Sequence, residues 1–164
     1  MAPFLASRTA PAGCGNTWGI WLGARGPILH RQMRLGLGGI PFAMWKFRSM
    51  HNDRVTRAGS VLRRYRVDEL PQLLNVIAGD MSLVGPRPER PEIAERILED
   101  VPDFDLRCML RPGMAGLAQI LVEHDSRPAV KLRYDLTYMC SWSLWLDVRL
   151  LFRSIAAALS GSGM

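Results

Sequence analysis

The sequence predicts an α+β fold, a mostly helical single domain with a few short strands and one hairpin. Apolar residues recur at helical spacing in several segments, whereas only short stretches alternate as strands do. The chain has 164 residues, of which 48% are hydrophobic and 22% charged, so it can bury one ordinary core. We expect a poorly ordered N-terminal extension at residues 1–25 and a folded domain at residues 26–164.

Short strands are expected in two places. The segment PFAMWKFR (41–48) has bulky residues in rough alternation, and the Gly-rich GLGG (36–39) before it is typical of a turn. Together they predict a small hairpin. The segment LAQILV (117–122) is also predicted as a strand.

Helices are predicted for residues 91–100, 128–140 and 143–159, and for a segment within VDELPQLLNVI (67–77). Residues 59–66 are predicted as a short basic helix or a turn. In the segment at 67–77, four apolar residues at positions i, i+3, i+4 and i+7 form one face: Leu70, Leu73, Leu74 and Ile77. Pro71 falls in the first turn, where its missing N–H costs no hydrogen bond. Asp68 then takes a capping position and Gly79 ends the helix.

The helix at 143–159 has two interpretations, which the sequence leaves open. Its apolar stripe consists of Leu144, Val148, Leu151, Phe152 and Ile155, and Arg149 and Arg153 lie one turn apart on another face. Such a helix either packs its stripe into the core or lies on a membrane surface.

Charge and cysteine content narrow the class of protein. The formal net charge is +6 and the basic residues are mostly arginine, so the expected partners carry negative charge: a nucleotide, a nucleic acid or a lipid headgroup. No nucleic-acid-reading motif is present. The three cysteines are far apart and odd in number, which predicts neither a disulfide framework nor a zinc site. No apolar run is long enough to cross a bilayer.

The adjacent carboxylates Asp68 and Glu69 also have two interpretations. They are a helix cap with a second acid near the positive end of the helix dipole, or they hold a divalent cation close to phosphates. Nearby turns favour the second interpretation. GDMSLVGPRP (79–88) presents Arg87 on a proline-rich loop, and LRPGMAG (110–116) presents Arg111 in the same way.

A strand end adds two more cations. In WKFRSM (45–50), Lys46 and Arg48 are two residues apart, so they share one face of the strand. Two carboxylates that can hold a hard cation, near several loop-mounted arginines, suit the chemistry of a diphosphate.

Five segments, taken in order, resemble the bacterial sugar transferases, the monotopic polyprenyl-phosphate phosphoglycosyl transferases that begin exopolysaccharide assembly. These segments are GPILHRQ (26–32), PFAMWKFRSM (41–50), LRRYRVDELPQLLNVIAGDMSLVGPRPERPE (62–92), LRPGMAGLAQI (110–120) and KLRYDLTYMCSWSLWLDVRLL (131–151). The likeness covers residues 26–159, and its most specific part is DELPQL followed by GDMSLVGPRP.

The resemblance implies an enzyme that moves a phosphosugar from a UDP-sugar to polyprenyl (undecaprenyl) phosphate and releases UMP, at the cytoplasmic face of the bacterial inner membrane. It implies that Asp68 is the nucleophile and that Glu69 beside it binds Mg²⁺, with Asp68 in the same metal site. It implies that Arg87 binds phosphate. Arg111, Arg48 and Lys46 are expected near the phosphates from their location, whereas Asp147 is either functional or a structural partner of an arginine.

Three departures from the family pattern shape further expectations. Residues 1–25 supply no hydrophobic re-entrant helix, so we expect peripheral attachment to an anionic membrane surface. The stretch after KFRSM is shortened, and Leu117 replaces a tryptophan. The alternatives are a truncated non-catalytic remnant or scaffold of the family and, less favoured, a basic nucleic-acid-binding module.

Overall fold

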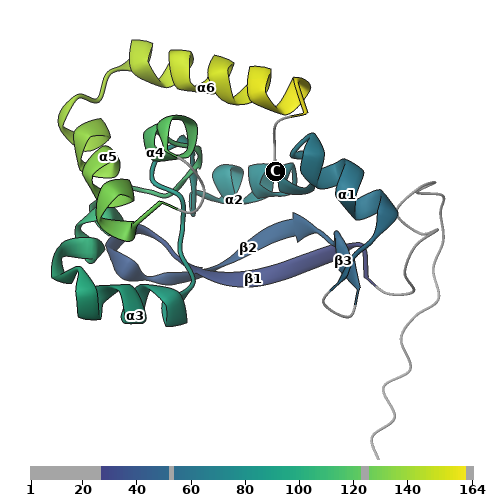
Figure 1. Ribbon diagram of the computed structural model, residues 1–164, viewed down its shortest axis with the longest axis horizontal. Coiled ribbons are helices and arrows are strands. Elements are labelled where there is room, and N and C mark those ends of the chain that lie inside the picture. Colours follow the sequence, from purple (N-terminus) through teal and green to yellow (C-terminus); the bar gives the residue numbers. More distant parts are fainter. Residues whose placement is uncertain (1–26, 52–53, 123–125, 162–164) are drawn as a thin grey trace, which may run out of the picture.

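A two-stranded hairpin begins the part of the chain that the computed structural model describes, which comprises residues 27–51, 54–122 and 126–161. Strands β1 (Leu29–Leu35) and β2 (Pro41–Phe47) pair antiparallel (Figure 1). The turn between them contains Gly38 and Gly39 at φ values of 65° and 75°, a left-handed conformation that glycine adopts without a Cβ clash. The predicted hairpin and its Gly-rich turn are confirmed.

The other strands are short. β3 (Met50–His51) and β4 (Arg54–Val55) pair antiparallel, and β5 (Ser82–Val84) pairs parallel with β6 (Gly113–Ala115). The parallel pair is tightly packed, because a Cβ on Gly113 would lie 2.0 Å from the backbone nitrogen of Gly85. Glycine at this position therefore lets β6 lie directly against the loop that follows β5.

Helices account for much of the remaining described chain, and the predicted α+β fold is confirmed. The α-helices are α1 (Arg57–Arg64), α2 (Gln72–Ala78), α3 (Pro91–Asp100), α4 (Leu117–Leu121), α5 (Pro128–Cys140) and α6 (Leu144–Leu159). The 3-10 helices are Leu37–Gly39, Val67–Glu69 and Pro102–Met109. In Figure 1, α1, α2 and α6 lie on one side of the β1–β2 hairpin and α3 lies on the other.

The prediction of a strand at 117–122 is wrong, because α4 occupies Leu117–Leu121. Leu117 and Ile120 pack against the core cluster of Val84, Tyr138 and Leu150. These two residues are three apart, a spacing that puts them on one face of a helix but on opposite faces of a strand. Contact with the core thus selects the helix over the strand predicted from the sequence.

Helix α2 turns its polar side, and not its apolar side, toward the rest of the protein. Gln72 and Asn75 are 3% and 2% exposed, whereas Leu70, Leu73, Leu74 and Ile77 are between 41% and 83% exposed. The Asn75 amide fixes α2 to β2: its Oδ1 accepts from the Trp45 N–H at 3.0 Å, and its Nδ2 donates to the Ala43 carbonyl at 2.9 Å. A buried side-chain amide is stable here because its oxygen and nitrogen both have partners.

The prediction that Asp68 caps this helix is also wrong. Helix α2 starts at Gln72 after Pro71, and no side-chain oxygen caps it. Asp68 lies in the separate 3-10 helix Val67–Glu69, which is closed by the Leu70 N–H donating to the Val67 carbonyl at 3.1 Å. The predicted C-terminal end is confirmed, since Gly79 follows α2 with φ of 87°.

Helix α6 packs through a face that differs from the predicted stripe. Leu150 is fully buried in the core, and Leu146 and Leu151 pack beside it. Leu144, Phe152 and Ile155 are instead exposed. The core interpretation is therefore wrong for most of the stripe.

No helix in the described ranges is both long enough and apolar enough to cross a membrane. The extension expected at residues 1–25 lies outside the described residues.

Candidate active site

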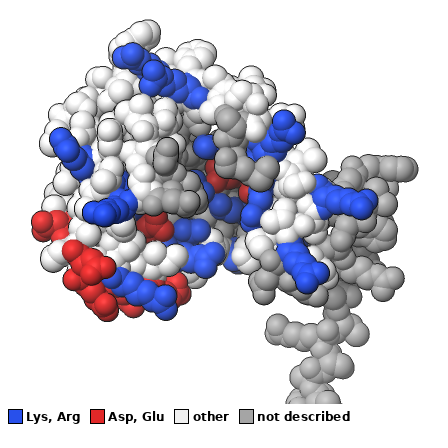
Figure 2. Space-filling view, viewed as in Figure 1, with Lys and Arg blue, Asp and Glu red and all other residues white. Residues whose placement is uncertain are grey.

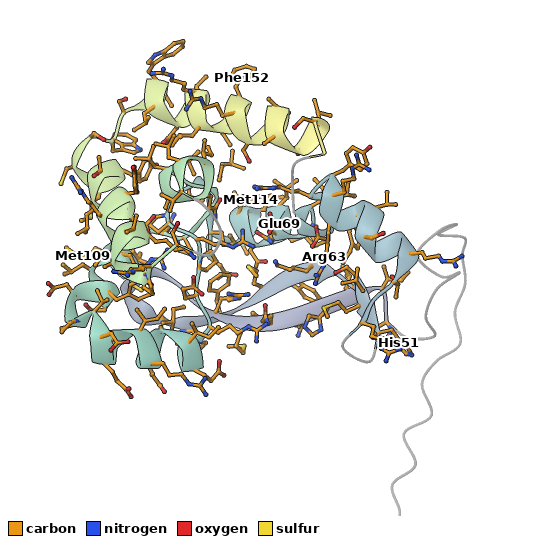
Figure 3. All side chains as sticks on the ribbon, viewed as in Figure 1. His51, Arg63, Glu69, Met109, Met114 and Phe152 are labelled. Atoms are coloured by element: carbon orange, nitrogen blue, oxygen red, sulfur yellow. The ribbon has the colours of Figure 1, made fainter. Side chains whose placement is uncertain are left out.

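The centre of the site is the Glu69 carboxylate, whose side chain is only 13% exposed. Its Oε1 accepts a hydrogen bond from Arg87 at 2.9 Å and lies 3.4 Å from the Lys46 ammonium. Figure 2 shows a hollow in the middle of the molecule where acidic atoms lie among basic ones, and Glu69 lies centrally in the same view (Figure 3). A mostly buried carboxylate flanked by two cations has its charge fully compensated, and the three groups together keep one net positive charge.

Three separate elements deliver these side chains. Lys46 lies on β2, Glu69 on the 3-10 helix Val67–Glu69, and Arg87 on the loop after β5. Arg66, just before the acidic pair, has a φ of 52°. Left-handed backbone is costly for a residue with a Cβ and is concentrated at functional sites. This residue turns the chain between α1 and the acidic pair.

The loop of residues 85–89, which we call the PRP loop, is held at four consecutive carbonyl groups. The carbonyls of Pro86 and Glu89 accept from the backbone N–H groups of Gly113 and Leu35, each at 2.9 Å. Those of Arg87 and Pro88 accept from the side chains of Arg107 and Arg34, at 2.9 and 3.0 Å. Proline has no N–H to donate, so carbonyl contacts are the main way to fix such a loop.

A second layer of buried charges supports the PRP loop, and sequence reasoning missed it. Arg107 is paired with Asp135 at 2.7 Å, and their side chains are 6% and 2% exposed. Glu89 lies 3.8 Å from both Arg107 and Arg34. Burial raises the pKa of Asp135 to about 6, although the charge of Arg107 opposes this. The sequence offers no short spacing that links Arg107 with Asp135, so only the folded chain reveals the pair.

The pKa values of the two adjacent carboxylates move in opposite directions. Burial raises the pKa of Asp68, the charge of Glu69 raises it further, and Lys46 and Arg63 oppose the rise. Burial alone would also raise the pKa of Glu69, but the charges of Arg87 and Lys46 outweigh it and lower that pKa. Such divergence is typical of acidic pairs whose members have different roles. The charges around Glu69 favour its ionised form, and Asp68 is more basic than an ordinary aspartate.

The same burial and charges also shift the pKa values of the two neighbouring cations, Lys46 and Arg87. Burial lowers the pKa of Lys46, and the nearby charge of Arg87 lowers it further. Burial would lower the pKa of Arg87 as well, but the charge of Glu69 and the hydrogen bond to it raise that pKa overall. Arg87 therefore keeps its charge firmly in this site.

The structure brings together four of the predicted site residues: Asp68, Glu69, Arg87 and Lys46. It directs Arg48 elsewhere, because its Nε donates to the Met50 carbonyl at 3.0 Å and its guanidinium meets His51 at 3.2 Å. Arg111 has an exposed side chain and makes no described ion pair with the cluster. The expectation that all four cations converge on one centre therefore holds for Arg87 and Lys46 only.

Asp147, whose role the sequence left open, has a structural environment. It accepts hydrogen bonds from the Tyr138 hydroxyl at 2.7 Å and from the Trp142 indole at 3.1 Å. These contacts join α5 to the start of α6. The described partners are thus aromatic side chains and not the arginine that was one of the two alternatives.

The expected Mg²⁺ can be compared with the donors present. Within the described ranges no cluster of three or more His, Cys, Asp or Glu side chains is suited to a metal. Mg²⁺ commonly takes only one or two carboxylates and completes its shell with water and substrate phosphates. Asp68 and Glu69 meet that requirement, because the described contacts of Glu69 use Oε1 alone. The residues present therefore fit a phosphate-bound Mg²⁺.

Comparison with known proteins identifies the family. The family model described as bacterial sugar transferase matches residues 4–161. The chain belongs to this family. The match extends further toward the N-terminus than the resemblance at 26–159, and it confirms the predicted family.

Proteins of several bacteria are similar to this chain. A UDP-glucose:undecaprenyl-phosphate glucose-1-phosphate transferase of Caulobacter vibrioides is 41% identical over 86% of the chain and 60% of its own length. A UDP-N-acetylgalactosamine-undecaprenyl-phosphate N-acetylgalactosaminephosphotransferase of Aeromonas hydrophila is 39% identical over 88% of the chain and 38% of its own length. An exopolysaccharide production protein of Rhizobium leguminosarum is 38% identical over 86% of the chain and 82% of its own length. The chain thus spans well under two thirds of some relatives and most of another.

The electrostatics of the acidic pair can be tested directly. Glu69→Gln removes a negative charge beside Asp68, so the pKa of Asp68 should fall toward its ordinary value. Lys46→Met removes a nearby positive charge, so that pKa should rise. Asp68 becomes ionised as the pH rises through its pKa, and a carbon-detected NMR titration of its carboxyl group measures both shifts. Glu92→Gln on the exposed face of α3 is the control and should leave the pKa of Asp68 unchanged. Equal titration curves for the native chain and all three variants would contradict this account.

Proposed function

We propose that this chain is a phosphoglycosyl transferase that moves a phosphosugar from a UDP-sugar to polyprenyl phosphate and releases UMP. The observation that carries the proposal is the division of the acidic pair: Glu69 is held by Arg87 and Lys46, while Asp68 beside it is more basic than usual. Membership of the bacterial sugar transferase family and the names of its relatives support the same reaction class.

In the first step an ionised Asp68 oxygen attacks the phosphorus that carries the sugar. A new bond forms between oxygen and phosphorus, the bond from this phosphorus to the bridging oxygen breaks, and UMP leaves with the electron pair. In the second step a phosphate oxygen of the polyprenyl phosphate attacks the same phosphorus. The bond to Asp68 then breaks, which restores the carboxylate and leaves the sugar joined to the lipid through a diphosphate.

The charges around Asp68 suit this chemistry. A carboxylate approaching a phosphate meets electrostatic repulsion, and Arg87 and Lys46 offset it with fixed positive charge. Bound Mg²⁺ would neutralise developing charge on the phosphate oxygens, with Glu69 and Asp68 as its protein ligands. Glu69 is a poor nucleophile by comparison, because two cations hold its oxygen and lower its pKa.

The first test is to trap the covalent intermediate. The protein is incubated with MgCl₂ and a UDP-sugar but without lipid acceptor, using UDP-glucose, UDP-galactose and UDP-N-acetylgalactosamine in turn. One of these should add one phosphosugar to the chain, which is detected by intact mass and mapped to the peptide containing Asp68. Asp68→Asn should abolish the adduct, because an amide is not a comparable nucleophile.

Controls separate this chemistry from misfolding. Asn has nearly the shape of Asp, and Asp68 caps neither the 3-10 helix nor α2, so Asp68→Asn should fold normally. Glu69→Gln should slow adduct formation without moving its position. Native-rate turnover by Asp68→Asn, with deamidation excluded by mass, would contradict the mechanism. A native protein that forms no adduct and releases no UMP with any donor would favour a non-catalytic remnant.

A second prediction concerns Arg87. Arg87→Ala should reduce kcat/KM by about 10²-fold or more, comparable to removing one preorganised charge-stabilising donor. Arg87→Lys should recover only part of this loss, because an ammonium keeps the charge but not the planar pair of donors. Rates of UMP release measure both variants, and circular dichroism checks their folding. Native kinetics in both would remove Arg87 from the site.

We also propose that α2 and α6 face a membrane surface. Both helices present exposed apolar side chains, and α6 adds exposed Arg149 and Arg153. The apolar residues are Leu70, Leu73, Leu74 and Ile77 near α2, and Leu144, Trp145, Phe152, Ile155 and Leu159 on α6. On the other side of the hairpin, α3 exposes Glu92, Glu95 and Glu99. Anionic lipid would attract the first side and repel the second.

This orientation predicts salt-sensitive adsorption to anionic vesicles. The protein should sediment with phosphatidylglycerol vesicles more than with phosphatidylcholine vesicles, and added salt should weaken the binding because it screens Arg149 and Arg153. The double variant Trp145→Ser/Phe152→Ser should bind less, whereas Ile93→Ser on α3 should bind as the native chain does. Retention through both high salt and alkaline carbonate would argue against adsorption through these helices.

A further inference from the structure

A cavity of about 390 Å³ lies beside the candidate active site, within the range of roughly 300–1,000 Å³ found for small-molecule sites. Five segments line it: the end of β1 with the turn that follows, the PRP loop, α3, the 3-10 helix Pro102–Met109, and the short stretch with Leu110 and Pro112 that leads to β6. No residue of α1, α2 or α6 contributes to its walls. The cavity is therefore separate from the apolar surfaces of α2 and α6.

The walls of the cavity are mainly apolar, with a few charged groups. Leu98, Phe104 and Leu110 are among the apolar lining residues, and Glu89 and Arg107 are among the charged ones. The side chain of Arg107 is buried, with only 6% of its surface exposed, and its Nε–H donates to no described group. A buried donor without a partner is costly, and a ligand oxygen or ring nitrogen would satisfy it.

Arg87 connects this cavity to the acidic pair. Its guanidinium binds Glu69 at 2.9 Å, and the residue also lines the cavity. If a diphosphate binds at Arg87, a group attached to that diphosphate can therefore reach into the cavity. In a nucleotide-sugar one such group is a nucleoside, which combines a flat apolar base with a few polar edge atoms.

We propose that this cavity binds the nucleoside of the nucleotide-sugar donor and of the nucleoside monophosphate that is released. This inference rests on the proposed function and adds the location of the nucleoside. The other groups present in the reaction fit less well. A sugar needs polar partners around most of its ring, and a polyprenyl chain has no use for the buried charges of Glu89 and Arg107.

Labelling of Cys108 can report whether the cavity is occupied, because this residue lines the cavity and carries a free thiol. The double variant Cys14→Ser/Cys140→Ser leaves Cys108 as the only cysteine of the chain. Burial raises the pKa of the Cys108 thiol, so N-ethylmaleimide labelling is followed at mildly alkaline pH by intact mass. With MgCl₂ present, UMP at ten times its Kd should slow labelling about tenfold, by mass action.

Matched ligands identify which part of the donor occupies the cavity. Pyrophosphate and glucose 1-phosphate, at equal occupancy, should protect Cys108 far less than UMP does, because neither carries a nucleoside. Cys108→Ser in the same background should take up no label, which confirms the labelled position. Protection by pyrophosphate equal to that by UMP would overturn the proposal, and so would protection by glucose 1-phosphate.

The proposal and the reaction can fail separately. If UMP competes with the UDP-sugar in turnover but leaves the labelling rate of Cys108 unchanged, the nucleoside binds elsewhere and the proposal is wrong, while the transferase activity stands. If UMP neither protects Cys108 nor inhibits, and Asp68 forms no adduct, both the nucleoside site and the proposed function are wrong.

Discussion

The architecture of the site depends on the immobilisation of the PRP loop by its carbonyl groups. Four consecutive carbonyls, from Pro86 to Glu89, accept hydrogen bonds from β1, β6 and the arginines Arg34 and Arg107. Parts of the chain that are far apart in sequence thereby meet at one short segment. Because two of the loop residues are prolines without an N–H, the loop cannot be held by donating from those positions. The position of the Arg87 guanidinium follows from these contacts.

Burying so many arginines requires compensating acids, and this requirement organises the second layer. Glu69 faces Arg87 and Lys46, Glu89 lies between Arg34 and Arg107, and Asp135 pairs with Arg107. Each buried charge thus has an opposite neighbour, without which desolvation would be prohibitive. The same charges help to shift the pKa values of the two carboxylates of the acidic pair in opposite directions. The charges of Arg87 and Lys46 lower the pKa of Glu69, whereas burial and the charge of Glu69 raise the pKa of Asp68.

The molecule also has two distinct sides. Helices α2 and α6, which carry exposed apolar residues, lie on one side of the β1–β2 hairpin, and the acidic helix α3 lies on the other (Figure 1). The cavity beside Arg87 is lined from the side of α3. This arrangement would let a lipid substrate and a soluble nucleotide reach the same acidic pair from different directions. Helix α2 itself buries Gln72 and Asn75 and leaves its leucines exposed.

Local signals in the sequence determined much of the fold and pointed to part of the candidate site. The Gly-rich turn of the hairpin and its second strand β2, the helix that begins at Pro91 and the end of α2 at Gly79 follow from turn residues and periodicity that act within a few positions. The acidic pair and Arg87 were found because each lies in a short, specific motif. Tertiary structure alone decided that α4 is a helix, that the apolar face of α2 is exposed, and that Arg48 turns away from the site. Tertiary structure alone also places Arg107 beside Asp135 and Arg34 beside the PRP loop. Periodicity shows that a helix has two faces but not which one meets the core, and pairs of charges distant in sequence become neighbours only when the chain folds.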